Sequence, residues 1–351
     1  MKILKYLLFL ILIVLIGGAI YFGTQDGVFD VADSKIINAP AEVVYDNVKD
    51  YKNWKTWGPW MELDPNVKVN YAEKTEGEGA SYSWDSDHTE VGTGSMQTTK
   101  VIPNKEIEQK ITFNTPIGDS KSDVYWRFDP TETPGQTKVT WGMRGEQTFM
   151  EKVFMAFQKD DMETGISNMF QKGLSNLETV VLEEMKKFTI NVDGVTQFGG
   201  GYYMYVTTAS KMNEVGSKMG SMMEQVSRYM QDNNLPITGM PFTLYNDIDD
   251  LNGTVIFSAC VPVKERVITP SGSPALCGYM EPVTALKTTL KGNYENLPAT
   301  YSKATQYMTA NKLEMLSNGK MFQVYITDPG MVPNPANWIT EIYHPLAESQ
   351  N

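Results

Sequence analysis

The residue best suited to binding or acid–base chemistry is a glutamate near the C-terminus, Glu341. It lies within the run 338–346, WITEIYHPL. Its β-branched and aromatic neighbours are typical of a strand, on which alternate side chains share a face. Ile339, Glu341 and Tyr343 would therefore lie together. Because a carboxylate among apolar and aromatic groups is costly to bury without a partner, we predict a small-molecule pocket around Glu341.

Two interpretations of Glu341 stay open. In the first, the carboxylate pairs with a cationic ligand, and the aromatic faces of Tyr343, Tyr245 or Trp338 help to hold the charge. Trp338 alternates to the strand face opposite Glu341. In the second, Glu341 lies on an exposed strand face or pairs with a lysine or arginine of the chain.

Other site chemistries find little support. The chain has two cysteines and two histidines, and His88 and His344 lie far apart without a neighbouring cysteine. We therefore predict no metal, no cofactor and no catalytic set of nucleophile and base. The net charge of −12 argues against nucleic acid as a partner, because phosphate binding needs clustered lysine and arginine.

The stretch 239–263 organises the C-terminal half. Its apolar runs 240–245 and 254–263 flank an acidic turn, which predicts an antiparallel hairpin. A second hairpin between 254–263 and 275–283 would bring Cys260 opposite Cys277. A disulfide and two free thiols remain alternatives for this pair.

An internal repeat is visible in this half. Residues 229–235, YMQDNNL, match 307–313, YMTANKL, in spacing, and each follows a helical pattern and precedes a similar strand. Duplication of one helix-plus-strands unit predicts a two-fold cleft that places Tyr245 and Tyr325 at related positions.

Residues 188–348 resemble the GyrI-like effector-binding family. The resemblance rests on the run MPFTLY from Met240, the turn NGT from Asn252, the strand end VPV from Val261, and EIYHPL from Glu341. It implies two pseudo-symmetric strand–helix–strand–strand modules with a ligand cleft between them, in which Glu341 matches the family's glutamate.

Residues 28–188 follow a different order: a strand, a helix, six strand-like runs and a long helical pattern over 162–185. This order indicates a helix-grip sheet around an apolar interior. We predict that aromatic residues line this interior, with methionines on the helix side; the alternative is a filled core. The residues are Tyr82, Trp84, Trp126 and Trp141, with Met155, Met162 and Met169.

The opening of this segment resembles the SRPBCC superfamily, which includes START, Bet v 1 and polyketide-cyclase-like proteins. The residues that carry the resemblance are INAPAEVVY from Ile37, DYKNW from Asp50 and WGPW from Trp57. It implies a deep, mainly apolar cavity between the curved sheet and the long helix, and no particular reaction.

The N-terminus carries an uncharged apolar run, Tyr6–Phe22, preceded by Lys2 and Lys5. Its length suits a bilayer-spanning helix, and the flanking charges place the N-terminus in the cytoplasm and the rest of the chain outside. A cleaved signal peptide is the alternative. The predicted organisation is an anchor and linker over 1–27, a helix-grip domain over 28–188 and a GyrI-like domain over 189–351.

Together these features predict an α+β protein that is anchored in a membrane and binds or senses a small amphipathic or apolar ligand. Two other functions remain open. One is a cyclase- or hydrolase-like enzyme that uses Glu341 as a general base. The other is a carrier of hydrophobic ligands. No feature of the sequence identifies a protein partner.

Overall fold

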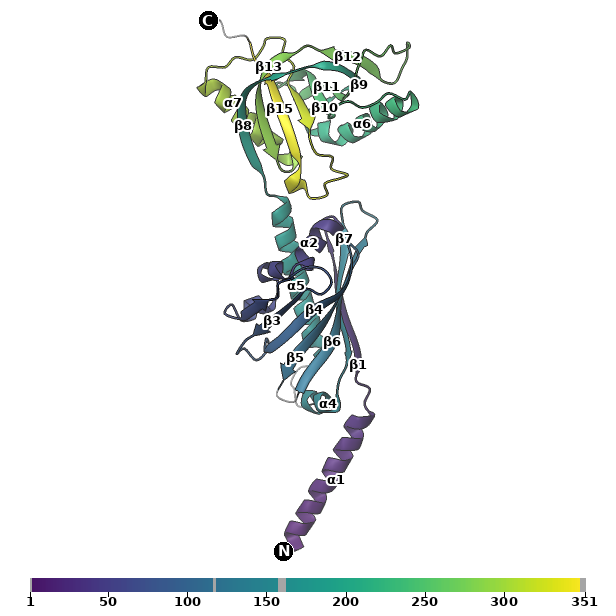
Figure 1. Cartoon of the computed structure of the whole chain (residues 1–351), viewed down its shortest axis with the longest axis vertical. Coiled ribbons are helices and arrows are strands. Elements are labelled where there is room, and N and C mark those ends of the chain that lie inside the picture. The colour runs from purple at the N-terminus through teal and green to yellow at the C-terminus, as the bar shows by residue number, and fades with distance from the viewer. Residues whose placement is uncertain (1, 116–117, 157–161, 348–351) are drawn as a thin grey trace. The chain divides into compact units, whose positions relative to one another are not determined.

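The computed structural model describes residues 2–115, 118–156 and 162–347. The chain divides between Glu184 and Met185 into two compact units, and each is built around one antiparallel sheet (Figure 1). The predicted α+β class with an N-terminal apolar helix is confirmed.

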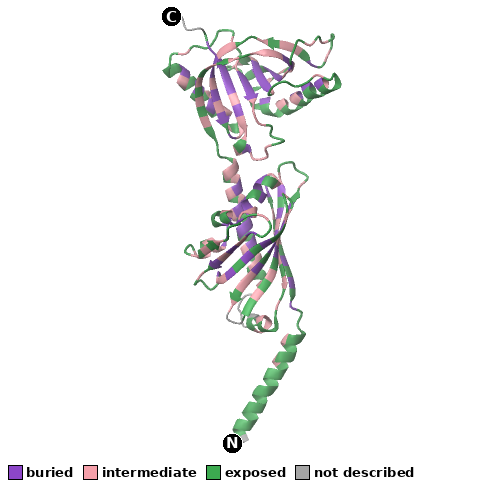
Figure 2. Cartoon of the chain, viewed as in Figure 1, coloured by how far each residue is buried: buried purple, intermediate pink, exposed green. Residues whose placement is uncertain are grey.

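The N-terminal helix α1 spans Lys2–Thr24. From Ile3 to Thr24 it is long and apolar enough to cross a membrane, a property that anchors and signal sequences share. Its apolar side chains are exposed along the helix (Figure 2). A helix that is apolar on every side is typical of a membrane span or of a helix buried within a protein.

The first unit has a seven-stranded sheet in the order β1-β7-β6-β5-β4-β3-β2. Strand β1 therefore crosses to pair with β7, and the other strands follow as a meander. The strands are β1 Val28–Ile37, β2 Lys68–Tyr71, β3 Ser81–Asp85, β4 Thr93–Ile102, β5 Glu106–Thr115, β6 Gly118–Pro130 and β7 Thr137–Glu146. The helices are α2 Ala41–Lys49, α3 Trp60–Leu63, α4 Phe149–Met155 and α5 Met162–Met185, with a 3₁₀ segment at Tyr51–Thr56.

Helix α5 packs against the sheet through the apolar stripe that its sequence spacing predicts. Phe170, Leu174, Leu177 and Val181 on this stripe are buried. Gly173 lies within the same stripe, and a Cβ atom there would be 2.5 Å from Cζ3 of Trp141. The glycine therefore lets the helix pass close over the tryptophan ring of β7.

The second unit has an eight-stranded sheet in the order β12-β9-β11-β10-β14-β15-β13-β8. The strands are β8 Thr189–Phe198, β9 Gly201–Lys211, β10 Phe242–Asp249, β11 Thr254–Pro262, β12 Leu276–Met280, β13 Val283–Lys291, β14 Phe322–Tyr325 and β15 Ile339–Pro345. Helix α6, Val215–Asp232, covers β9 and β11, and helix α7, Leu297–Ala310, covers β13 and β8. The predicted hairpin of β10 and β11 is present.

The strand order reads as two related halves that meet at β10 and β14. There Phe242 lies opposite Val324 and Leu244 opposite Phe322, so the register is symmetrical about the central pair. The repeated helix ends also match: the residue after each cap, Asn234 or Lys312, has a positive φ of 53° or 54°. The duplication read from the sequence therefore has a structural counterpart in both the helices and the strands.

The prediction that residues 254–263 and 275–283 pair as a hairpin is wrong. Strand β9 lies between β11 and β12, with Cys260 beside Tyr205 and Cys277 beside Met204. Two strand spacings amount to about 9–10 Å, beyond the reach of a disulfide. Both cysteines are free thiols. The error arose because the sequence gives no sign that an earlier strand is inserted between these two.

Candidate functional site

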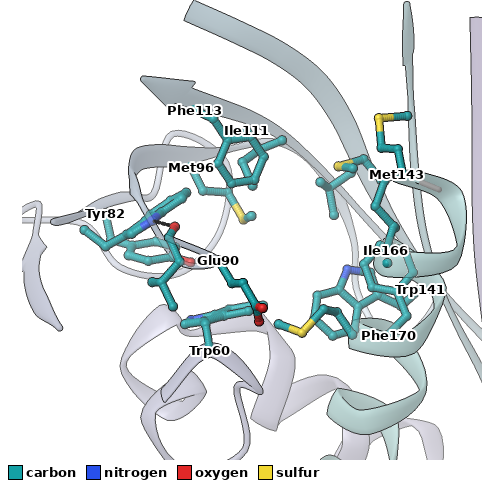
Figure 3. Close-up of a pocket in the computed structure, with 16 residues that line it drawn as sticks. Trp60, Tyr82, Glu90, Met96, Ile111, Phe113, Trp141, Met143, Ile166 and Phe170 are labelled. Carbon is teal, nitrogen blue, oxygen red and sulfur yellow. Dashed lines mark hydrogen bonds between the residues drawn. The ribbon is translucent and has the colours of Figure 1, made fainter. Parts of the chain in front are cut away.

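The first unit contains a cavity of about 310 Å³ between β3–β7 and helix α5. This volume falls at the lower end of the range typical of small-molecule sites. Its described walls are mainly aromatic and aliphatic (Figure 3). The lining residues on the sheet side include Tyr82, Trp84, Met96, Ile111, Phe113 and Trp141, and those on the helix side include Met162, Ile166, Met169 and Phe170.

The predicted aromatic residues take different places around this cavity. Trp84 and Trp141 line it, whereas Trp126 is fully buried behind Trp141 and stacks on it at 4.4 Å between ring centroids. Tyr82 also lines the cavity. Burial raises the pKa of Tyr82 well above its usual value, so its hydroxyl stays neutral.

Methionines supply an adaptable part of the wall. Met162 and Met169 line the cavity as the sequence indicates, and Met96 and Met143 join them from the sheet. The side chain of Met155 lies outside the described residues. Unbranched thioether side chains can adjust to ligands of different shape.

Sequence reasoning missed one charged residue of the wall, Glu90. It is exposed, lies in the 86–92 connection between β3 and β4, and extends toward Trp60 in Figure 3. The connection is tied to the wall because Nε1 of Trp84 donates to the carbonyl of Val91 at 3.2 Å. No local motif could have revealed Glu90, because strands distant in the sequence form the cavity.

In the second unit, Glu341 has partners from within the chain. Nζ of Lys287 donates to Oε1 of Glu341 at 2.6 Å, and the hydroxyl of Tyr343 donates to Oε2 at 2.7 Å. Lys287 lies directly across from Tyr343 on β13, which places it diagonally from Glu341. The ion pair is part-buried, with side-chain exposures of 26% and 20%. The structure therefore favours the second interpretation, pairing with a lysine of the chain.

An aromatic stack lies beside this ion pair. The rings of Tyr343 and Phe322 are nearly parallel at 4.8 Å, and Phe198 packs against both. Burial, followed by the hydrogen bond to Glu341, raises the pKa of Tyr343 above its usual range, so it remains a donor at neutral pH. Lys287 was missed because the pairing of β13 with β15 is not local in sequence.

Tyr245, Tyr325 and Trp338 do not join Glu341. Glu341 lies opposite Val324, so the next residue of β14, Tyr325, faces the other side of the sheet. Tyr245 packs there under helix α6, and the hydroxyl of Tyr325 lies 2.7 Å from Oγ1 of Thr243. Trp338 precedes β15 and donates to the carbonyl of Val332 at 2.7 Å.

Among the described residues, no group of three or more histidine, cysteine, aspartate or glutamate side chains is arranged to hold a metal ion. His344 is buried on the helix-covered face of the second sheet, and burial lowers its pKa to about 4. It is therefore neutral near pH 7.

Comparison with protein families gives two matches. Residues 28–182 match the family described as polyketide cyclase / dehydrase and lipid transport, and residues 202–347 match the GyrI-like small molecule binding domain. None of the curated proteins searched matches the chain.

Several solved structures are similar to parts of this chain at low identity. The C-terminal domain of EcmrR is 18% identical, with a TM-score of 0.40, over 46% of this chain and 98% of that one. EcmrR in a complex with DNA matches at 18% identity and a TM-score of 0.40, over 57% of this chain and 77% of that one. Protein MLL2253 from Mesorhizobium loti matches at 17% identity and a TM-score of 0.33, over 44% of this chain and 97% of that one.

The strand order, the grip of α5 on the first sheet and the two-fold second sheet agree with these family matches. The chain therefore contains an apolar N-terminal helix, then a domain of the SRPBCC superfamily over residues 28–182, and then a GyrI-like domain over residues 202–347.

Proposed function

We propose that this protein binds or senses small apolar or amphipathic molecules and is held at a membrane by its N-terminal helix. The observation that carries the proposal is the cavity of about 310 Å³ in the first unit. An aromatic and methionine wall favours apolar ligands because it removes their surface from water. The description of the first family includes lipid transport beside polyketide cyclase and dehydrase, and the second is described as a small molecule binding domain, which supports the same class of function.

The second unit offers a separate candidate site around Glu341 and Tyr343. Because Lys287 already neutralises Glu341, a cationic ligand must displace an ammonium group before it reaches the carboxylate. Each carboxylate oxygen already accepts one hydrogen bond from within the chain, so a substrate proton would compete with the Lys287 ammonium and the Tyr343 hydroxyl. These contacts favour ligand binding over general-base catalysis at Glu341.

The proposed placement has α1 in the membrane, the N-terminus in the cytoplasm and both units outside. Lysines before the apolar run and aspartates after it support this orientation. We propose no nucleic-acid partner, on the basis of the net charge of −12. Protease treatment of spheroplasts tests the placement: added protease should degrade both units while cytoplasmic markers survive.

The binding proposal is tested with 2-ethylnaphthalene as an apolar probe and the full-length protein in lipid nanodiscs. Gly165 lines the cavity, and a Cβ atom there would meet nothing within 4 Å. Gly165→Leu should therefore occupy the cavity or cover its opening without disturbing α5. Empty nanodiscs correct for partition of the probe into lipid.

The matched control is Gly220→Leu in α6 of the second unit, where a Cβ atom also meets nothing within 4 Å and the residue is not part of the cavity wall. Calorimetric binding should be lost in Gly165→Leu and kept in Gly220→Leu. Equal binding by both variants would contradict the proposed cavity site.

A further inference from the structure

The cavity wall contains a buried hydrogen-bond donor that has no partner within the described part of the chain. Nε1 of Trp141 makes no hydrogen bond, although the residue is only 2% exposed. The neighbouring buried tryptophans behave differently: Nε1 of Trp54 donates to the carbonyl of Val48, and Nε1 of Trp126 donates to Gln109. Because buried donors are nearly always paired, an unpaired one that borders a cavity indicates a missing partner.

The packing of Trp141 turns the ring edge that carries this donor toward the cavity, and the nitrogen atom itself exposes less than 1 Å². One face of its ring stacks on Trp126 at 4.4 Å and the other on Phe170 at 4.5 Å. Its Cζ3 edge lies against Gly173, where a Cβ atom would be 2.5 Å away. The nitrogen is on the opposite edge of the indole. Figure 3 shows it on the side of the ring that faces the cavity.

The negative charge of the cavity wall disfavours anionic ligands. Glu90 is the one charged side chain among the described residues that line the cavity, and it is exposed. None of the ion pairs within the described residues neutralises it. A carboxylate on a ligand would meet like charge there, whereas a neutral or cationic group would not.

We propose that the cavity takes a neutral or cationic amphipathic molecule whose carbonyl or hydroxyl oxygen accepts a hydrogen bond from Nε1 of Trp141, and that it rejects fatty-acid-like anions. The inference rests on the proposed function, because it requires that the cavity is a binding site. It adds the polar contact that orients the ligand and the sign of charge that the site tolerates.

Three probes of similar shape separate these contributions: 2-acetylnaphthalene carries an acceptor, 2-ethylnaphthalene carries none, and 2-naphthoate is an anion. For full-length protein in nanodiscs, we expect 2-acetylnaphthalene to bind about two- to tenfold more tightly than 2-ethylnaphthalene, the range of one net hydrogen bond. The anion should bind most weakly. Trp141→Phe should remove the preference for the acceptor while keeping an aromatic ring in the stack.

Trp126→Phe is the matched control, because it loses the same atoms but its N–H already donates to Gln109. This variant should keep the acceptor preference. In the wild type, ¹⁵N-indole NMR should show the Trp141 N–H resonance move downfield with 2-acetylnaphthalene and not with 2-ethylnaphthalene. This measurement does not depend on how well the variants fold.

The outcomes separate this inference from the proposed function. Equal affinity for the two neutral probes, an acceptor preference that survives in Trp141→Phe, or tight binding of 2-naphthoate would overturn the inference and leave the cavity as a binding site. If no probe binds, or if Gly165→Leu binds as well as the wild type, the proposed function fails and the inference fails with it.

Discussion

The packing of α5 beside the cavity predicts that one substitution changes stability differently at two glycines of the same helix. At Gly173, a Cβ atom would lie 2.5 Å from Cζ3 of Trp141 and 3.2 Å from Cδ of Pro59. At Gly165, it would meet nothing within 4 Å. Both residues belong to α5, so Gly→Ala brings the same gain in helix propensity to each.

The magnitudes follow from two opposing effects. Replacing glycine by alanine within a helix stabilises it by about 1 kcal/mol, whereas overpacking a well-filled core costs about 1–3 kcal/mol. Gly165→Ala should therefore raise the free energy of unfolding of the first unit by up to about 1 kcal/mol. Gly173→Ala should be neutral or lower it by up to about 2 kcal/mol, because Trp141 or the helix must move. The two variants should differ by about 1–3 kcal/mol.

Urea denaturation followed by tryptophan fluorescence measures this difference. Trp338 lies in the second unit and the other six of the seven tryptophans lie in the first, so the signal reports mainly on the first unit. Equal stability of the two variants would refute the close approach of α5 to Trp141. It would also remove the packing argument that turns the nitrogen-bearing edge of the indole toward the cavity.

Three further predictions concern the second unit. Lys287→Met should lower its free energy of unfolding by about 1–3 kcal/mol because Glu341 loses a part-buried partner, and adding Glu341→Gln should recover most of the loss; an unchanged denaturation midpoint in the single variant would contradict this. Burial lowers the pKa of His344 to about 4. Between pH 6.5 and 4, the imidazole is therefore protonated in the unfolded chain and neutral in the folded chain. The free energy of unfolding should be fully retained above pH 6.5 and fall by about 3 kcal/mol toward pH 4, and His344→Gln should flatten this part of the profile. Both cysteines should react with a thiol reagent after non-reducing denaturation, and loss of both thiols would mean that a bond had formed.

The elements of the fold were predictable because local spacing determines them. The apolar stripe of α5, the hairpin of β10 and β11 and the repeated helix ends all follow from residues close together in sequence. The order of strands across the sheet is different, because it depends on pairing between distant segments. For that reason the insertion of β9 between β11 and β12, which separates the cysteines, was not foreseen.

The candidate sites follow the same rule. Trp84 and Trp141 were found because large aromatic residues on strands of a helix-grip sheet point to its interior. Lys287 was missed because only the pairing of β13 with β15 brings it to Glu341. Glu90 was missed because it lies in a connection between strands, where alternation gives no direction. In each case the missing information is long-range.

Methionine methyl NMR of the full-length protein in nanodiscs tests the central claim, ligand binding in the helix-grip cavity, most directly. Four methionines line the cavity, Met96, Met143, Met162 and Met169, and the exposed Met240 and Met331 of the second unit serve as internal references. Titration with 2-ethylnaphthalene should shift the four cavity methyl resonances to saturation and leave the two references unchanged. Unmoved cavity resonances, or equal shifts at all six methyl groups, would contradict the account.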